Sequence, residues 1–274
     1  MKIAVHQMCS GIAPENNISQ MVKAIGDARA AGAEFYFAPE MSILLDRDRS
    51  RSAAHVEVED GRALQALQIA AADARIWVHL GSMAVRDSAG GKLANRSLII
   101  DDKGNIAGRY DKMHLFDVDL STGETWRESS AYAAGTSPVI VQTPLGRMGL
   151  SICYDMRFPD LYSTLSKNGA DMFAVPAAFT VPTGRAHWHA LLRARAIESE
   201  AFVVAAAQCG AHEDGRQTYG HSLVIDPWGD VLLDMGQGEG LGFADIDLTR
   251  LQEVRAQIPV HANRRDIGKE VKFY

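Results

Sequence analysis

The sequence predicts one α/β domain whose sheets are not purely parallel. Short apolar segments of strand length alternate with amphipathic segments of helix length from end to end. No linker and no shift in composition divides the 274 residues, so we expect a single domain over residues 1–274 with a tail from about residue 259. Turn sequences such as residues 226–229 (DPWG), between apolar segments, indicate β-hairpins, which join antiparallel strands.

The first half of the chain alternates strand-like and helix-like segments. We expect strands over residues 3–8, 34–38, 76–85 and 96–101, and helices over residues 17–31 and 62–74. In the first helix Ile18, Met21 and Ile25 recur at the spacing of one helical face. The polar segment 46–60 has no such period, and we expect it to be a loop.

The second half begins with a long segment that has no clean period. Residues 116–138 are predicted to be a loop, and loops of that length within one domain are usually functional. Beyond it we expect strands over residues 139–141, 147–152, 172–175, 202–207, 222–225, 231–233 and 242–246, and helices over residues 161–165, 188–199 and 248–257. The polar and basic residues from Pro259 form the expected tail.

Cys153 lies where the chain changes from a strand to a helix. Residues 148–152 are mostly apolar, and Pro159 follows as a residue suited to the first turn of a helix. At such an elbow a side chain is exposed on a tight turn, and backbone N–H groups can point at a developing negative charge. A buried core thiol is the competing interpretation of a cysteine with apolar neighbours.

Three charged residues could cooperate with a cysteine nucleophile. Such a nucleophile needs a base to take its proton and a group that stabilises the oxyanion. Glu40 ends a strand among apolar residues, so we expect it to be partly desolvated, with a raised pKa, as general acid–base work requires. Lys112 is the candidate cation, and Glu128 lies in the long loop. Each of the three could instead be a surface charge, the commoner fate of these residue types.

Three short motifs together resemble the signatures of the nitrilase (carbon–nitrogen hydrolase) superfamily. They are residues 39–40 (PE), 110–115 (YDKMHL) and 153–159 (CYDMRFP), and they occur in the order and spacing of that family, each at a predicted strand end. The resemblance extends over the whole chain. Asp111 departs from it, because a basic or small residue is more usual before the lysine.

The resemblance implies a catalytic triad of Glu40, Lys112 and Cys153. A further glutamate, which assists positioning or proton transfer in the family, corresponds to Glu128. The implied chemistry is hydrolysis of a carbon–nitrogen bond through a cysteine thioester, with Lys112 and the backbone N–H of Tyr154 holding the oxyanion. The implied fold is a four-layer α-β-β-α sandwich of two stacked sheets, whose subunits pair as a homodimer or assemble into a higher homo-oligomer.

Later segments narrow the resemblance to a branch of amidases. Residues 186–198 look like the helix that follows the cysteine, and residues 204–210 and 219–229 look most like the type that hydrolyses deaminated glutathione. The alternatives are an ω-amidase acting on α-ketoglutaramate and an N-carbamoyl amino acid hydrolase. The implied substrate is a small amide with a carboxylate, for which Arg157 and Arg185 are candidate partners.

Other classes of function fit the sequence less well. A nitrilase-fold interaction protein is the alternative outside enzymes, although Glu40, Lys112 and Cys153 are all present. The Gly-x-Ser-x-Gly elbow of serine hydrolases does not occur in the sequence. The glycine motifs of dinucleotide-binding and P-loop proteins do not occur either.

The spacing of histidines and cysteines does not predict a metal site. His187, His189, Cys209, His212 and His221 match no ligand pattern. The first two, two residues apart on a predicted helix, point to different faces. We therefore expect neither a metal nor another cofactor.

Composition and charge favour a cytoplasmic protein that binds a small molecule. A formal net charge of −6 argues against a nucleic-acid surface, and no apolar run is long enough to span a membrane. The N-terminus enters a strand without a signal-peptide pattern. Three widely spaced cysteines argue against a disulfide framework and for a reducing compartment.

Overall fold

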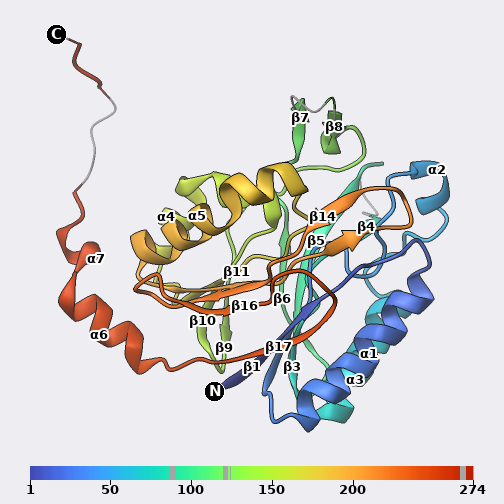
Figure 1. Ribbon diagram of the computed structural model, residues 1–274, viewed down its shortest axis with the longest axis horizontal. Coiled ribbons are helices and arrows are strands. Elements are labelled where there is room, and N and C mark those ends of the chain that lie inside the picture. Colours follow the sequence, from blue (N-terminus) through green and yellow to red (C-terminus); the bar gives the residue numbers. More distant parts are fainter. Residues whose placement is uncertain (87–90, 120–122, 124, 266–269, 274) are drawn as a thin grey trace.

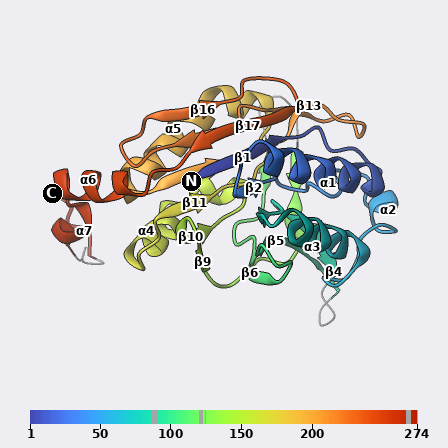
Figure 2. The same ribbon diagram turned by 90° about the horizontal axis from the view of Figure 1, so that it is seen from below.

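Two β-sheets lie face to face between two layers of helices (Figures 1 and 2). The computed structural model describes residues 1–86, 91–119, 123, 125–265 and 270–273. Helices α1 (Pro14–Ala30) and α3 (Arg62–Ala74) cover the first sheet, and α4 (Pro159–Lys167) and α5 (Val181–Ser199) cover the second. No helix within these ranges is long and apolar enough to pass through a bilayer. The predicted α-β-β-α sandwich with mixed sheets is confirmed.

The first sheet runs in the order β17-β1-β2-β3-β5-β4, with β6 beside β5. Its strands are β1 (Lys2–Gln7), β2 (Phe35–Phe37), β3 (Trp77–His79), β4 (Met83–Arg86), β5 (Leu93–Ile100), β6 (Ile106–Asp111) and β17 (Gly240–Asp245). Strands β1, β2 and β3 are parallel, and the others pair antiparallel. Because side chains alternate along a strand, Ile3 and Phe35 face the second sheet, whereas Ala4 and Tyr36 face the helices.

The second sheet runs in the order β16-β15-β12-β11-β10-β9. Its strands are β9 (Ile140–Thr143), β10 (Gly146–Leu150), β11 (Met172–Ala174), β12 (Phe202–Ala205), β15 (Leu223–Ile225) and β16 (Val231–Asp234). Strands β10, β11 and β12 are parallel, and the flanking strands pair antiparallel. Every residue of β11 and β12 is buried, because the first sheet covers one face and helices cover the other.

Short elements connect the layers and close the ends of the sandwich. They are α2 (Arg49–Ser52), η1 (Glu128–Ser130), η2 (Cys153–Arg157), the hairpin of β7 (Asp117–Asp119) with β8 (Thr125–Arg127), and the hairpin of β13 (Cys209–Ala211) with β14 (Gln217–Tyr219). Helices α6 (Thr249–Gln257) and α7 (Val260–Asn263) lie at one end, beside α4 (Figure 1). Arg255 of α6 pairs with Asp171 there, with 3.0 Å between Nη1 and Oδ1.

Three segments differ from the sequence expectation. The strand expected over residues 76–85 is divided into β3 and β4, because Gly81 turns the chain with a φ of 80°. A Cβ at that position would lie 1.9 Å from the carbonyl oxygen of Pro39, so only glycine fits. Strand β6 was not expected, and its pairing with β5 explains it. Helix α5 begins before residue 188, with Pro182 in its first turn.

The two segments predicted as loops contain short regular elements. The segment 46–60 contains α2, and the Asp48 carboxylate caps this helix by accepting from the Ser50 N–H at 3.0 Å. The segment 116–138 contains β7, β8 and η1, and its residues 120–122 and 124 lie outside the described residues. Residues 266–269 and 274 of the expected tail also lie outside them, while α7 occupies the start of that tail.

Candidate active site

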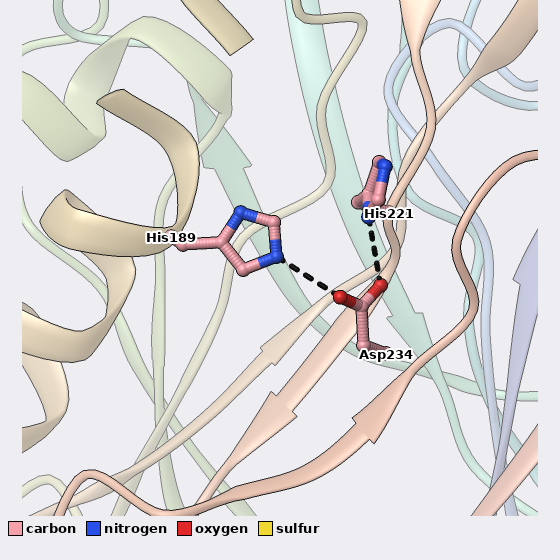
Figure 3. Close-up of side chains that lie close together, drawn as sticks. All are labelled: His189, His221 and Asp234. Atoms are coloured by element: carbon pink, nitrogen blue, oxygen red, sulfur yellow. Dashed lines mark hydrogen bonds and ion pairs between the residues drawn. The ribbon is translucent and has the colours of Figure 1, made fainter. Parts of the chain in front are cut away.

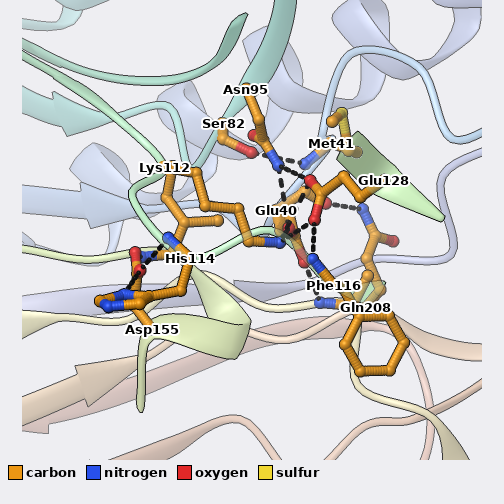
Figure 4. Close-up of polar contacts among 12 residues, drawn as sticks. Glu40, Met41, Ser82, Asn95, Lys112, His114, Phe116, Glu128, Asp155 and Gln208 are labelled. Carbon is orange, nitrogen blue, oxygen red and sulfur yellow. Dashed lines mark hydrogen bonds and ion pairs between the residues drawn. The ribbon is translucent and has the colours of Figure 1, made fainter. Parts of the chain in front are cut away.

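The ends of three strands meet at the proposed site, between the two sheets. Glu40 follows β2 and Lys112 follows β6 of the first sheet, whereas Cys153 follows β10 of the second. All three side chains are buried, with exposed fractions of 5%, 2% and 7%. Glu128 reaches the same place from η1, at the end of the long loop (Figure 4). The fold therefore assembles the four residues that the sequence predicted.

The Lys112 ammonium lies between two carboxylates (Figure 4). Its Nζ donates to Glu40 Oε1 at 2.8 Å and to Glu128 Oε2 at 3.0 Å. An ammonium has three N–H donors, and the third faces Glu128 Oε1 in a longer contact of 3.3 Å, which is the one that a substrate atom can displace most easily. The backbone of Lys112 is fixed as well, because its N–H donates to the Asn95 carbonyl at 2.9 Å and its carbonyl accepts from the Gly135 N–H at 2.8 Å.

Asn95 on β5 is part of the site, although the sequence gave no sign of it. Its Nδ2 donates to Glu40 Oε1 at 3.0 Å and to Glu128 Oε1 at 3.1 Å. Its Oδ1 is buried and has no hydrogen-bond partner in the part of the chain that the structure describes. Turning the amide over would place that oxygen against both carboxylates, so the observed orientation is the favourable one. Asn95 and Lys112 thus hold the same two carboxylates from different strands.

The loop that carries Glu40 is held from several sides. Glu40 Oε2 accepts from the Ala178 N–H at 2.9 Å, which ties the carboxylate to the second sheet. The carbonyl of Glu40 accepts from Gln208 Nε2 at 3.0 Å. The next residue, Met41, has a φ of 54°, and its N–H donates to Ser82 Oγ at 3.0 Å. This backbone conformation is uncommon outside glycine, and such residues concentrate at functional sites.

Cys153 occupies the strand-to-helix elbow that the sequence predicted. It opens η2 with a φ of 48°, and its N–H donates to the Pro176 carbonyl at 2.9 Å. Pro159 begins α4 directly after the elbow. The strained turn projects the thiol toward Glu40 and Lys112, whose charges both act on its pKa.

Asp155 fixes the backbone of the elbow through hydrogen bonds, and the sequence alone did not point to this residue. It is fully buried, and its Oδ2 accepts from the Ile152 N–H at 2.9 Å and from the Tyr110 hydroxyl at 2.7 Å. Its Oδ1 accepts from the His114 backbone N–H at 2.9 Å. Asp155 therefore connects the cysteine elbow to the segment that presents Lys112. Its position within the motif of residues 153–159 is the sequence feature that could have indicated this role.

The charges of the site stabilise one another. Burial alone would lower the pKa of Lys112, but the charges of Glu128 and Glu40 hold it well above its usual value. Burial and the Glu40 charge raise the pKa of the Cys153 thiol, and Lys112 offsets this only in part. The resting site therefore contains a neutral thiol beside an ammonium and its carboxylates.

The expectation of a raised pKa for Glu40 was wrong. Burial does favour a raised pKa for Glu40, as its apolar neighbours in the sequence led us to expect. The charge and hydrogen bond of Lys112, together with the Ala178 N–H donor, outweigh it and lower the pKa of Glu40. Glu40 is therefore ionised in the resting site and ready to accept a proton from the thiol.

Tyr154 and Arg157 follow Cys153 in η2. The Tyr154 ring meets Phe116 edge-on, with 5.0 Å between ring centroids. Arg157 lies over the Phe179 ring at 5.3 Å and places Nη2 3.2 Å from His187 Nδ1.

Two further predicted features can be placed. Arg185 is exposed near the start of α5. Asp111, the departure from the family pattern, pairs with Arg96 at 2.7 Å between Nε and Oδ1. The Asp111 carboxylate is therefore paired with Arg96 and not with Lys112. The ion pairs of Lys112 are with Glu40 and Glu128.

Known proteins are similar to this chain over nearly its whole length. The model of the carbon-nitrogen hydrolase family matches residues 2–256. A Bos taurus protein named deaminated glutathione amidase is 40% identical over 267 residues, which cover 96% of this chain and 81% of that protein. A Yersinia enterocolitica protein of the same name is 36% identical over 272 residues, with 98% and 94% covered.

A solved structure has the same fold. The crystal structure of the Caenorhabditis elegans NitFhit protein is similar with a TM-score of 0.89 at 39% identity, and the match covers 96% of this chain and 65% of that one. Family model, relatives and fold agree over nearly the whole chain. The chain belongs to the carbon–nitrogen hydrolase family.

Proposed function

We propose that this hydrolase is a cofactor-independent amidase for small amides that carry a carboxylate, with deaminated glutathione as the foremost substrate. The observation that carries the proposal is the buried Lys112 ammonium between Glu40 and Glu128, beside the Cys153 thiol. The substrate is suggested by the names of the Bos taurus and Yersinia enterocolitica relatives. Hydrolysis of α-ketoglutaramate and of N-carbamoyl amino acids are the alternatives.

Acylation begins with proton transfer from Cys153 to Glu40. The sulfur then bonds to the amide carbon, and the carbonyl oxygen becomes an oxyanion. The Lys112 ammonium, which exchanges its longer contact with Glu128 for the oxyanion, and the backbone N–H of Tyr154 stabilise that oxyanion. The Tyr154 N–H is suited to this role, because it bonds no acceptor in the part of the chain that the structure describes. The C–N bond breaks as Glu40 returns its proton to the leaving nitrogen.

Deacylation uses the same groups with water in place of the thiol. Glu40 takes a proton from water, and the resulting hydroxide attacks the thioester carbon. The C–S bond breaks, the acid is released, and Glu40 returns the proton to Cys153. Because its pKa is lowered, Glu40 is ionised at the start of each half-reaction. Glu128 does not meet the reacting atoms in this scheme, and it positions Lys112.

Asn95 should act as a positioning residue for this reaction. Replacing it with Leu removes both donors to Glu40 and Glu128 while keeping a side chain of similar size. We expect kcat to fall about 100-fold, because displacement of a catalytic group by about 1 Å has that effect. KM should change little, since Asn95 contacts catalytic carboxylates and no substrate group is assigned to it.

Steady-state kinetics across pH would check the role of Asn95. A positioning role predicts that the acidic limb of the kcat profile shifts upward, because Glu40 loses a hydrogen bond that favours its charged form. An unchanged profile with a lower fraction of folded protein would instead indicate a purely structural role. The conservative Asn95→Gln variant should recover part of the lost kcat if the donated hydrogen bonds are what matters.

Arg216 is a third candidate, beside Arg157 and Arg185, for binding the substrate carboxylate. Its guanidinium lies over the Trp126 ring at 5.1 Å and bonds Asp214 through Nε at 2.7 Å. Burial and the charges of Glu128 and Glu40 raise the pKa of Tyr132, whereas the charges of Lys112 and Arg216 lower it, so Arg216 lies within electrostatic range of a residue that also feels the catalytic charges. Burial is the main cause that raises the pKa of Tyr132 to about 12.

A substrate panel tests both the reaction and the anion partner. The panel holds deaminated glutathione, α-ketoglutaramate, succinamate and an N-carbamoyl amino acid, and the products are measured by chromatography. We expect the highest kcat/KM for deaminated glutathione. Arg216→Met should raise KM about tenfold or more for the anionic amide, the loss of one charge-assisted hydrogen bond.

The arginine variants and the panel separate the alternatives. Arg29→Met is the matched control, because Arg29 is exposed on α1, and we expect it to retain the wild-type KM. If Arg185→Met alone raises KM, the anion partner is Arg185. If Arg157→Met alone raises KM, the anion partner is Arg157. Turnover only of α-ketoglutaramate would move the protein to the ω-amidase assignment. No turnover of any amide would favour an interaction protein with this fold.

We further propose a homodimer in the cytoplasm. All three cysteines are free, which suits a reducing compartment. Ile197 of α5 and Trp228 are large apolar side chains with exposed fractions of 48% and 42%. Gly229, the residue after Trp228, lies against Ile197, because a Cβ on Gly229 would lie 2.7 Å from Ile197 Cδ1. Val231 and Leu232 of β16 are also exposed, and pairing of subunits would cover apolar surface of this kind.

A further inference from the structure

A group of two histidines and one aspartate lies outside the catalytic site (Figure 3). His189 comes from α5, His221 from the link between β14 and β15, and Asp234 from the end of β16. His189 Nε2 lies 3.0 Å from Asp234 Oδ2, and His221 Nδ1 lies 2.9 Å from Asp234 Oδ1. One ligand atom from each side chain falls within 4.8 Å of the other two.

His221 has a positive φ angle, a backbone conformation that is uncommon for residues other than glycine. Among described residues other than glycine, positive φ angles occur at Met41, Arg75, Cys153, Glu200 and His221. Two of these end α3 and α5 as left-handed helix caps. Two others belong to the catalytic site. Only His221, with a φ of 54°, is left without such a reason, and strain of this kind concentrates where a side chain must be aimed.

The surroundings of His221 hold it in that conformation. Its N–H donates to the Gly236 carbonyl at 2.7 Å, and its carbonyl accepts from Trp188 Nε1 at 2.7 Å. Its ring stacks on Tyr219, with 4.5 Å between centroids and 21° between planes. The imidazole is therefore fixed with Nδ1 aimed at Asp234 before any ligand arrives.

Asp234 is oriented in the same way. Its Oδ1 accepts from the Gly236 N–H at 2.9 Å, in addition to its contact with His221. Burial tends to raise the pKa of Asp234, but this N–H donor and the two histidines outweigh that and lower it. A backbone donor that fixes a carboxylate is typical of the outer contacts that orient metal ligands.

We propose that His189, His221 and Asp234 bind a divalent transition-metal ion, with Zn²⁺ as the ion that suits them best. Two imidazole nitrogens and one carboxylate oxygen are a donor set that Zn²⁺ accepts, with water in the fourth position. Ligand atoms around tetrahedral Zn²⁺ lie about 3.4 Å apart. The observed separations of 3.0 and 2.9 Å are close to this value, and the remaining separations between ligand atoms, up to 4.8 Å, must shorten as the ion draws the imidazoles together. Each imidazole would coordinate the ion through the nitrogen that now faces the carboxylate, as a neutral ring whose proton lies on its other nitrogen.

The ion would tie helix α5 to the edge of the second sheet. The three ligands come from α5, the β14–β15 link and β16. The link and the end of β16 share backbone hydrogen bonds, whereas α5 meets the link here through the Trp188 side chain. The site holds none of Glu40, Lys112 and Cys153, so its role is structural and independent of the proposed amide chemistry. The side chains of His189 and Asp234 are about one-third exposed, which leaves access for the ion and for a bound water.

Metal titration of the full-length protein tests the proposal. Thiols also bind Zn²⁺, and Cys9 Sγ lies 3.6 Å from His212 Nδ1. The background is therefore a Cys9→Ser, Cys153→Ala protein, titrated with zinc chloride by calorimetry and with Co²⁺ by absorption spectroscopy. We expect one strong equivalent of Zn²⁺, and Co²⁺ d–d bands without a thiolate charge-transfer band. Thermal unfolding should shift upward with Zn²⁺.

Variants show whether these three residues hold the ion. Asp234→Asn and His221→Gln should weaken Zn²⁺ binding by more than about 100-fold, since even outer contacts of metal ligands cost 10- to 100-fold. His187→Gln is the matched control, because His187 lies on the same helix and faces Arg157 instead, and it should bind Zn²⁺ as the background protein does. No Zn²⁺ uptake, or equal binding by the Asp234→Asn and His221→Gln proteins, would overturn the proposal and leave two histidines bonded to an aspartate.

Discussion

Cys153→Ala is expected to abolish amide turnover, with kcat lowered by about 10⁴-fold or more. The thiol supplies the atom that bonds to the amide carbon, and no other group at the site can replace it. Lys112 and Glu40 would still bind and polarise the substrate. Binding without turnover is therefore the expected state of this variant. Ammonia or amine release, measured with the best substrate of the panel, checks it.

The loss in Cys153→Ala must come from the nucleophile and not from the fold. Ala removes one sulfur atom from a buried position, so circular dichroism and thermal unfolding should stay close to wild type. Cys9→Ala is the matched control, because Cys9 lies outside the catalytic site, and we expect it to retain full activity. Substantial turnover by a folded Cys153→Ala protein would contradict the thioester mechanism.

Lys112→Met is expected to cost both activity and stability. The variant keeps an apolar side chain of similar length but leaves Glu40 and Glu128 as buried carboxylates without their cation. Removing one partner of a buried ion pair costs about 3–5 kcal/mol in the free energy of unfolding. Activity should fall by at least about 10²–10³-fold, the usual effect of losing one oxyanion donor. Urea unfolding and steady-state kinetics measure the two effects.

The stability loss in Lys112→Met should depend on pH in a definite direction. In the wild type the pKa of Glu40 is lowered by Lys112, so its contribution is present above the ordinary glutamate pKa and is lost as pH falls. Without Lys112, burial is opposed only by the hydrogen bonds from Cys153 and the Ala178 N–H, so Glu40 is protonated more readily in the folded variant. The difference in stability between wild type and variant should therefore be largest near neutral pH and shrink on acidification.

A surface lysine provides the comparison for Lys112→Met. Lys167 is exposed at the end of α4, and Lys167→Met should change the free energy of unfolding by no more than about 0.5 kcal/mol at any pH tested. A gap between Lys112→Met and wild type that stays constant or widens toward acid pH would contradict the charge array described for the site.

The sequence alone determined the elements that carry the chemistry. The apolar run before Cys153 and the proline after it specify a strand, an elbow and a helix, and these are local properties of the chain. The same local patterns placed Glu40 at a strand end, whereas Lys112 was identified by its family motif, because strand β6 before it was not expected. Burial of Glu40 was expected from its apolar neighbours and was found.

Only the tertiary structure decided what these residues meet. Asn95 sits on β5 with an unremarkable local pattern, and its bonds to Glu40 and Glu128 depend on strand pairing and on a loop distant in sequence. The direction of the Glu40 pKa shift depends on Lys112, because a buried cation outweighs the desolvation that a single segment implies.

The group of His189, His221 and Asp234 is likewise formed by tertiary structure and not by local sequence. Spacing along the chain argued against a metal site, because the nearest histidine pair lies on different faces of one helix. Folding instead brings one of those histidines to a second histidine and an aspartate from the sheet edge. Local sequence sets which groups a strand or helix presents, whereas charge, coordination and proton affinity depend on distances that only the packed layers fix.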